Sequence, residues 1–128
     1  MSSSDVVNFQ KTLLQLKSYL ASPITEDRDR AGIIQAFEFT FEQSWKAIQK
    51  TAGRMGSQVG NPKQAYTIAI QSGWIDRKEE DRWIRLLEDR NLTSHTYKED
   101  LAKEVLQRIQ NQYVQMFESL LKRLTNVN

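Results

Sequence analysis

Apolar residues recur along this chain at helical spacing, and this periodicity restricts the fold more than any other feature of the sequence. Val6, Phe9 and Leu13 begin one stripe at intervals of three and four residues, which places them on one face of a helix. Comparable stripes follow in three later segments. Only five glycines and two prolines interrupt 128 residues, so little in the sequence opposes helix formation. The pattern predicts an all-α protein.

Helix-breaking residues separate the first two long helices. The first is expected over about residues 5–20, before Pro23. The second is expected to begin between residues 25 and 27 and to last to about residue 52, because Gly53 has the residue type that commonly ends a helix. The apolar stripe of this second helix consists of Ile34, Phe37, Phe41, Trp45 and Ile48.

Capping signals predict three further helices in the second half of the chain. The Asn-Pro pair at residues 61–62 has the residue types of an N-cap and a first helical position, and opens a short helix that ends at Gly73. Residues 76–79, from Asp to Glu, have the spacing of a capping box for a helix that leads toward residue 90. Residues 96–99, from Thr to Glu, have the same spacing ahead of the last helix.

Four long amphipathic helices with short connections pack most economically as an antiparallel bundle. The short helix at residues 61–72 is then an additional cross-helix between the second and fourth elements. The chain shows no internal repeat and no domain-splitting linker, and its length suits one domain. We therefore expect an all-α, antiparallel four-helix bundle with a short cross-helix, which forms a single domain over residues 1–128.

Composition restricts the classes of function. Eighteen basic residues face sixteen acidic ones, for a net charge of +2, so any anionic partner must be attracted by local clusters of charge. The chain has no cysteine and one histidine, which excludes disulfides and thiolate metal sites and argues against any metal site or metal cofactor. No stretch approaches the ~20 apolar residues of a membrane span, and the N-terminus has no signal-peptide pattern. We expect a cytoplasmic protein.

Residues 90–97 concentrate the side chains that could perform chemistry. The only histidine of the chain, His95, follows Arg90 by five positions and stands among Thr, Ser and Tyr hydroxyls. Histidine is the side chain that titrates near neutral pH, and arginine is a permanent cation. Each residue alone also has a structural interpretation, as a solvated histidine, a helix-terminal arginine and a rim tyrosine. Their combination in one short segment favours a functional site.

A break in the helix is expected within this segment, because Asn91, Thr93 and Ser94 have low helix propensity. Arg90 then ends one helix, and Tyr97 lies on the first turn of the next. On a continuous helix Arg90 and His95 would point ~140° apart, so a break is what lets the two side chains and Tyr97 converge. The free N–H groups at the start of the last helix would favour a phosphate at the same place.

The spacing Arg-x4-His-x-Tyr, at Arg90, His95 and Tyr97, resembles the motif of the HEPN superfamily. More closely, the chain resembles the HepT-type toxins of HEPN/MNT toxin–antitoxin pairs, which are also described as nucleotidyltransferase substrate-binding proteins. The similarity extends to residues 41–46 and 73–75, and to Trp83 ahead of the motif. It covers nearly the whole chain in order and spacing.

The resemblance implies a metal-independent endoribonuclease toxin that needs no cofactor and acts on messenger or transfer RNA. In such a protein Arg90 and His95 form the catalytic site where two protomers of a homodimer meet. The cognate antitoxin, a minimal nucleotidyltransferase (MNT), neutralises the toxin by transferring AMP from ATP to Tyr97. We further expect Asn91 and Tyr97 to support RNA binding, and Lys46 to belong to a basic row that follows the RNA backbone.

The chemistry of RNA cleavage is consistent with this interpretation. Without a metal it needs a base for the 2′-hydroxyl, an acid for the leaving 5′-oxygen and a cation for the phosphorane. His95 can supply one of the first two and Arg90 the third. Acid–base catalysis by two histidines requires two copies of the chain, and a two-fold homodimer would bring both copies of His95 together. The expected products are a 2′,3′-cyclic phosphate and a 5′-hydroxyl.

Two other functions are compatible with the same residues. The protein could be a non-catalytic substrate-binding subunit of a separately encoded nucleotidyltransferase, with Tyr97 as the acceptor of the nucleotide. It could also be a purely structural helical adaptor. AMP on Tyr97 would add bulk and negative charge to a site suited to phosphate, and would repel RNA, which favours the toxin with Tyr97 as its switch.

Overall fold

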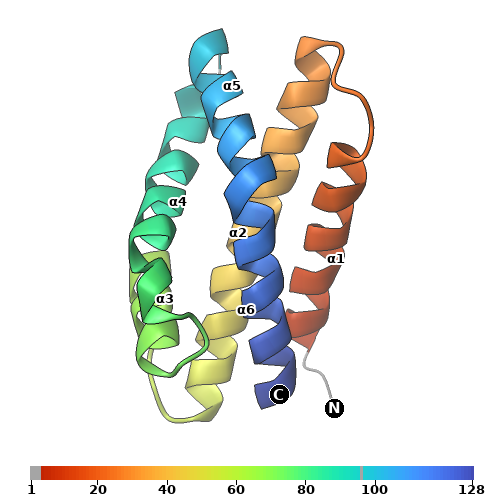
Figure 1. Ribbon diagram of the computed structural model, residues 1–128. Coiled ribbons are helices and arrows are strands. Elements are labelled where there is room, and N and C mark those ends of the chain that lie inside the picture. Colours follow the sequence, from red (N-terminus) through yellow and green to blue (C-terminus); the bar gives the residue numbers. More distant parts are fainter. Residues whose placement is uncertain (1–3, 96) are drawn as a thin grey trace.

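The computed structural model describes residues 4–95 and 97–128, and both ranges are helical with no strand (Figure 1). In chain order the elements are α1 (Ser4–Leu20), α2 (Asp27–Arg54), α3 (Pro62–Gln71), η1 (Arg77–Glu79), α4 (Glu80–Leu92), η2 (Thr93–His95), α5 (Glu99–Arg108), η3 (Ile109–Tyr113) and α6 (Val114–Val127). The 3₁₀ turn η1 precedes α4, and a second 3₁₀ turn, η2, follows it. The π-helical segment η3 joins α5 to α6 without a break.

The long helices lie side by side as a bundle, which confirms the predicted fold class. In Figure 1, α1, α2, α4 and the continuous α5–η3–α6 helix run along the same axis, and α3 lies beside the lower half of α4. The short helix α3 packs against both α2 and α4, as expected for the cross-helix. The described helices include none that is long and apolar enough to cross a membrane.

The predicted apolar stripes meet in the centre of this bundle. Phe9 and Phe117 are in edge-on contact, with ring centroids 6.0 Å apart, and Phe37 stacks on Tyr113 at 5.7 Å. All four rings are fully buried, and such aromatic pairs add about 0.5–1.5 kcal/mol each beyond burial alone. Trp45 of the second stripe is only partly buried at the edge of this cluster. The core thus joins α1, α2, η3 and α6.

Two glycines end helices, but one of them is not the predicted residue. Gly73, with φ +78°, ends α3 as expected. Gly53 does not end α2, since the helix continues to Arg54 and the left-handed position is occupied by Gly56 at φ +90°. A residue at such a φ is strained unless it is glycine, whereas Gly53 has ordinary helical surroundings.

The capping predictions for the last two helices also need correction. Asp76 accepts a hydrogen bond from the backbone N–H of Lys78 at 3.3 Å, and it caps η1 rather than α4. The helix α5 begins at Glu99 with Lys98 at the N-cap, and no side chain caps it. Thr96, the other half of the predicted capping box, lies outside the described residues. Charge at the helix start is supplied instead by acidic residues of the first turn of α5.

Candidate functional site

Arg90 lies in the last turn of α4, and its side chain extends toward α2. Its Nη1 atom is 3.1 Å from Oε2 of Glu38 and donates a hydrogen bond to Oγ1 of Thr93 at 3.0 Å. The guanidinium carbon lies 5.8 Å from the ring centroid of Phe41, within the range of a cation–π contact. Arg90 is therefore held between α4 and α2, and it is 30% exposed.

Thr93, the first residue of η2, connects these groups. Its hydroxyl oxygen lies 3.0 Å from Oε2 of Glu38 and 2.6 Å from the carbonyl oxygen of Arg90. A hydroxyl has one proton to donate and can accept from another group at the same time. The Thr93 hydroxyl thus accepts from the guanidinium while it donates to one of the two oxygens, and this arrangement ends α4 at a defined place.

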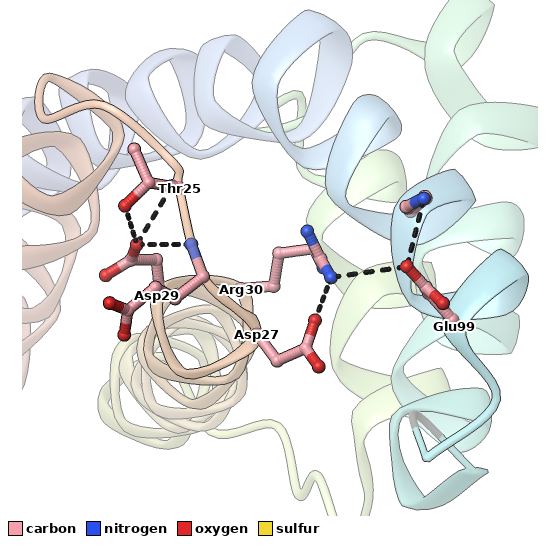
Figure 2. A network of polar contacts seen from close by, with 7 residues as sticks. Thr25, Asp27, Asp29, Arg30 and Glu99 are labelled. Atoms are coloured by element: carbon pink, nitrogen blue, oxygen red, sulfur yellow. Dashed lines mark hydrogen bonds and ion pairs between the residues drawn. The ribbon is translucent and has the colours of Figure 1, made fainter.

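His95 and Tyr97 lie together beyond this turn. Their ring centroids are 6.0 Å apart at an angle of 71°, and both side chains are exposed, Tyr97 by 77%. Tyr97 also borders a cavity of about 330 Å³ between the first turns of α2 and α5. Figure 2 shows the ion pairs there, where Arg30 bridges Asp27 and Glu99. The hydrogen bond from Lys103, and then the nearby positive charges, lower the pKa of Glu99 below its ordinary value.

A groove of about 670 Å³ lies between α2, α3 and α4, next to Arg90. The exposed Asn91 shares this wall with Arg90, and the buried Tyr66 and Trp83 contribute to its lining. Lys46, on α2, forms an ion pair with Glu42, another lining residue, at 3.9 Å. The groove has the size of a small-molecule or nucleotide site and combines apolar rings with polar groups.

The predicted site residues therefore form two neighbouring groups in one protomer. Arg90 and Asn91 line the groove, whereas His95 and Tyr97 meet at the connection between α4 and α5. Within the described ranges no hydrogen bond joins Arg90 to His95 or to Tyr97, and the Nη1 atom of Arg90 contacts Glu38 and Thr93 instead. The helix break expected between Arg90 and Tyr97 is present, as η2 follows α4. The expected place of Tyr97 on the first turn of the next helix is wrong, because α5 begins only at Glu99.

A second polar cluster, which the sequence did not indicate, surrounds Asp89. This carboxylate has no exposed surface, yet it accepts two hydrogen bonds from Arg108, at 2.6 and 2.9 Å, and one from the hydroxyl of Tyr113. Arg85 approaches it at 3.6 Å. Burial, followed by the hydrogen bond to Asp89, raises the pKa of Tyr113, and the bond to Asp89 also raises the pKa of Arg108.

The π-helical segment explains how both partners reach Asp89. Arg108 and Tyr113 are five residues apart, and on an ordinary α-helix they would diverge by ~140°. In η3 the backbone N–H of Val114 bonds to the carbonyl of Ile109, five residues earlier, which brings residues at this spacing onto nearly the same side. The sequence pattern had suggested only that Tyr113 belongs to an apolar stripe.

Glu38 is the other residue that the pattern missed. It follows Phe37 and precedes Phe41 by one turn, so it stands beside the buried stripe of α2. The sequence shows an acidic residue at the edge of an apolar stripe. It does not identify the partner of this residue, because Arg90 is distant in sequence.

The arrangement can bind an anion and move protons. Arginine binds phosphate oxygens through its planar fork of N–H donors, and histidine is suited to general acid–base catalysis near neutral pH. One protomer supplies one arginine of the motif and one histidine.

Comparison with known proteins agrees with the fold and with the family that the sequence resembles. The sequence matches the family described as "Nucleotidyltransferase substrate binding protein like" over residues 4–126. A crystal structure of a protein from Thermus thermophilus has a TM-score of 0.83, with 32% sequence identity over 91% of this chain and 98% of the other. No protein with a curated description matches the sequence.

Proposed function

Because the chain belongs to the nucleotidyltransferase substrate-binding protein family, the HepT-like branch that its motif resembles, we propose that it is a metal-independent endoribonuclease and the toxin of an HEPN/MNT pair. The observation that carries this proposal is the motif itself. His95 and Tyr97 meet at an exposed break that directly follows a helix whose last turn bears Arg90. A mobile, polar RNA backbone can reach such a surface.

The roles follow from the chemistry of each group. His95 acts either as the base that takes the proton of the 2′-hydroxyl or as the acid that protonates the leaving 5′-oxygen. Arg90 stabilises the charge that develops on the phosphate. Asn91 and Lys46 contact the RNA, whose phosphates attract the lysine. The substrate is messenger or transfer RNA, and cleavage leaves a 2′,3′-cyclic phosphate and a 5′-hydroxyl.

The active unit is a homodimer. A protomer has one histidine, whereas separate acid and base roles call for two, and a two-fold interface can supply the second copy. The exposure of His95 and Tyr97 supports this proposal, since both rings are accessible to another chain.

The cognate antitoxin is an MNT-family nucleotidyltransferase, which transfers AMP from ATP to the Tyr97 hydroxyl. The tyrosine oxygen loses its proton and bonds to the α-phosphorus, and pyrophosphate leaves. A side chain that is 77% exposed can enter the active site of another enzyme. The added phosphate places a negative charge at the far end of the Tyr97 ring, which lies beside His95. This charge repels the negatively charged phosphates of RNA from the site.

The exposure of the Tyr97 side chain also favours one alternative function. The protein would then be a non-catalytic substrate-binding subunit, in which Tyr97 accepts the nucleotide and the groove beside Arg90 binds a substrate of the nucleotidyltransferase. The two functions differ in whether the isolated protein cleaves RNA.

We expect the purified protein to cleave RNA in excess EDTA and to leave cyclic phosphate ends. The His95→Ala variant should be ~100- to 10,000-fold slower, the contribution typical of general acid–base catalysis. The exposed Lys11 of α1 offers a control, and Lys11→Ala should retain wild-type activity. The rates are measured on labelled RNA with identically purified proteins.

Cleavage by His95→Ala at the wild-type rate would contradict the catalytic role and would favour the acceptor function.

The wild-type protein and the His95→Ala variant also test the homodimer. After subunit exchange, an excess of His95→Ala should lower the activity per wild-type chain, because mixed dimers have one histidine. Activity per wild-type chain that does not change upon exchange would contradict a shared site.

A further inference from the structure

An acidic side chain of α2 holds the arginine of the motif. Oε2 of Glu38 forms an ion pair with Nη1 of Arg90 at 3.1 Å, and the same oxygen lies 3.0 Å from the Thr93 hydroxyl. Both members of the ion pair are 30% exposed, so solvent screens this pair less than one on the open surface. The contact joins residues that are 52 positions apart, one on α4 and the other on α2.

The remaining nitrogens of Arg90 show what this contact leaves available. Its Nε is buried and has no hydrogen-bond partner. Its Nη2 has no hydrogen-bond partner within the described residues and is not among the buried unpaired atoms. Since the guanidinium is planar, a contact that fixes Nη1 also fixes the direction of Nη2. Phe41, which lies under the group at 5.8 Å, restricts it further.

An arginine that is fixed before the substrate arrives is more effective than a free one. A long side chain loses rotamer freedom when it binds a phosphate, and this loss is smaller if the protein already holds the group in place. Donors that are oriented in advance toward the developing charge also contribute most to catalysis.

We propose that Glu38 is a positioning residue for Arg90, which it holds by Nη1 so that Nη2 remains directed to the scissile phosphate of RNA. This inference rests on the proposed ribonuclease function. Glu38 does not touch the substrate and acts only through Arg90. If the ion pair were no more than a stabilising contact, its removal would leave catalysis per folded molecule unchanged.

A double-mutant cycle on cleavage distinguishes these roles. We expect Glu38→Ala to lower kcat about 10- to 100-fold, the scale of a small misplacement of a catalytic group, with a smaller change in KM. In the Arg90→Ala background the same substitution should have no further effect. Glu38→Gln, which keeps a hydrogen-bond acceptor, should recover part of the activity.

Glu118→Ala is the matched control, since it removes a different ion pair between helices, with Lys17, whose members are 46% and 45% exposed and join α1 to α6. Its kcat should equal that of the wild type. The folded fraction of every variant is measured by circular dichroism, and rates are expressed per folded molecule. A Glu38→Ala variant with wild-type kcat, or with an effect equally large in the Arg90→Ala background, would overturn the positioning role.

A second measurement tests the positioning role of Glu38 independently of ribonuclease activity. If the wild-type protein cleaves no RNA, the ribonuclease proposal fails, and the positioning of Arg90 is judged by ¹⁵N NMR of its guanidinium. Restricted rotation should give distinct Nη signals in the wild type that merge in Glu38→Ala. Signals that are the same in both proteins would overturn the inference.

Discussion

At the scale of single residues, a buried carboxylate next to the motif helps to place Arg90. Asp89 directly precedes Arg90 and has no exposed surface. A buried carboxylate is costly unless it is paired and hydrogen-bonded, and here Arg108 and Tyr113 supply three hydrogen bonds. Asp89 therefore ties the last turn of α4 to α5 and η3, whereas Arg90 contacts Glu38 of α2.

Tyr113→Phe tests how much one of these bonds contributes. It removes the hydroxyl that donates to Asp89 and keeps the ring that stacks on Phe37. We expect the free energy of unfolding to fall by about 1.5–3 kcal/mol, the range for hydrogen bonds to charged groups. The measurement is equilibrium unfolding in urea at neutral pH.

Tyr66→Phe is the matched comparison, because Tyr66 is also buried but its hydroxyl bonds to the neutral Ser44 hydroxyl at 2.7 Å. It should cost about 1 kcal/mol. An equal or smaller loss in Tyr113→Phe would show that the charge of Asp89 adds nothing to the bond.

At the scale of elements, the start of α2 is held by a carboxylate of its own first turn. Asp29 accepts hydrogen bonds from the backbone N–H groups of Thr25 and Glu26, both at 2.9 Å, and from the Thr25 hydroxyl at 3.2 Å (Figure 2). The next residue, Arg30, reaches Glu99 of α5 at 3.6 Å. The ends of α2 and α5 that border Tyr97 are thus ordered by polar contacts.

The pH dependence of stability should reveal the role of Asp29. Hydrogen bonds from the backbone of Thr25 and Glu26 lower its pKa below the ordinary 3.8. A lowered pKa contributes stability above the ordinary value, which is lost as the pH falls through the folded-state pKa. We expect Asp29→Asn to unfold more easily than wild type at neutral pH, and the difference to vanish well below pH 3.8.

Asp100→Asn provides the control, since Asp100 also lies in the first turn of a helix, α5, but is exposed and has no hydrogen bond or ion pair of its side chain in the described chain. Urea unfolding of both variants is followed across the acid range. If Asp29→Asn and Asp100→Asn lose the same stability relative to the wild type, the effect comes from the interaction of a carboxylate with the helix dipole. The hydrogen bonds of Asp29 would then not be needed to explain it.

At the scale of the whole molecule, the chemistry-bearing residues are more open than a complete active site requires. Tyr97 is 77% exposed, His95 is exposed, and the Arg90 side chain is 30% exposed. Catalytic groups work best where water is excluded and donors are fixed. An open half-site of this kind is what a second copy or a partner enzyme would cover.

The AMP switch is a prediction at this scale, because it involves two proteins. With the cognate nucleotidyltransferase and ATP, the wild-type protein should gain the mass of AMP and lose ribonuclease activity. Tyr97→Phe has no hydroxyl to modify, so it should gain no mass and stay active. Intact-protein mass spectrometry and the cleavage assay report the two effects.

Tyr19→Phe is the matched control, since Tyr19 is also exposed, by 42%, but lies on α1. It should be modified like the wild type. AMP found on Tyr97→Phe, or lost from Tyr19→Phe, would assign the acceptor to another residue.

Local features were predictable because each depends on neighbouring residues. The stripe that begins at Val6 predicted the buried face of α1, and Asn61 predicted the start of α3, where its side chain accepts from the N–H of Gln64. The break after Arg90 was predicted in the same way, from the low helix propensity of the residues that follow. Gly53 was wrong as the end of α2, since a glycine can also be tolerated inside a helix.

The sequence by itself determined the helical class, the bundle and the motif of Arg90, His95 and Tyr97, because periodicity and spacing are properties of contiguous residues. Only the tertiary structure decided which side chains hold the motif. Glu38 is far from Arg90 in the sequence, and Asp89 meets Tyr113 only through a π-helical turn. Such pairs depend on how helices pack and turn about their axes, and a pattern read along one helix contains no information about its neighbour.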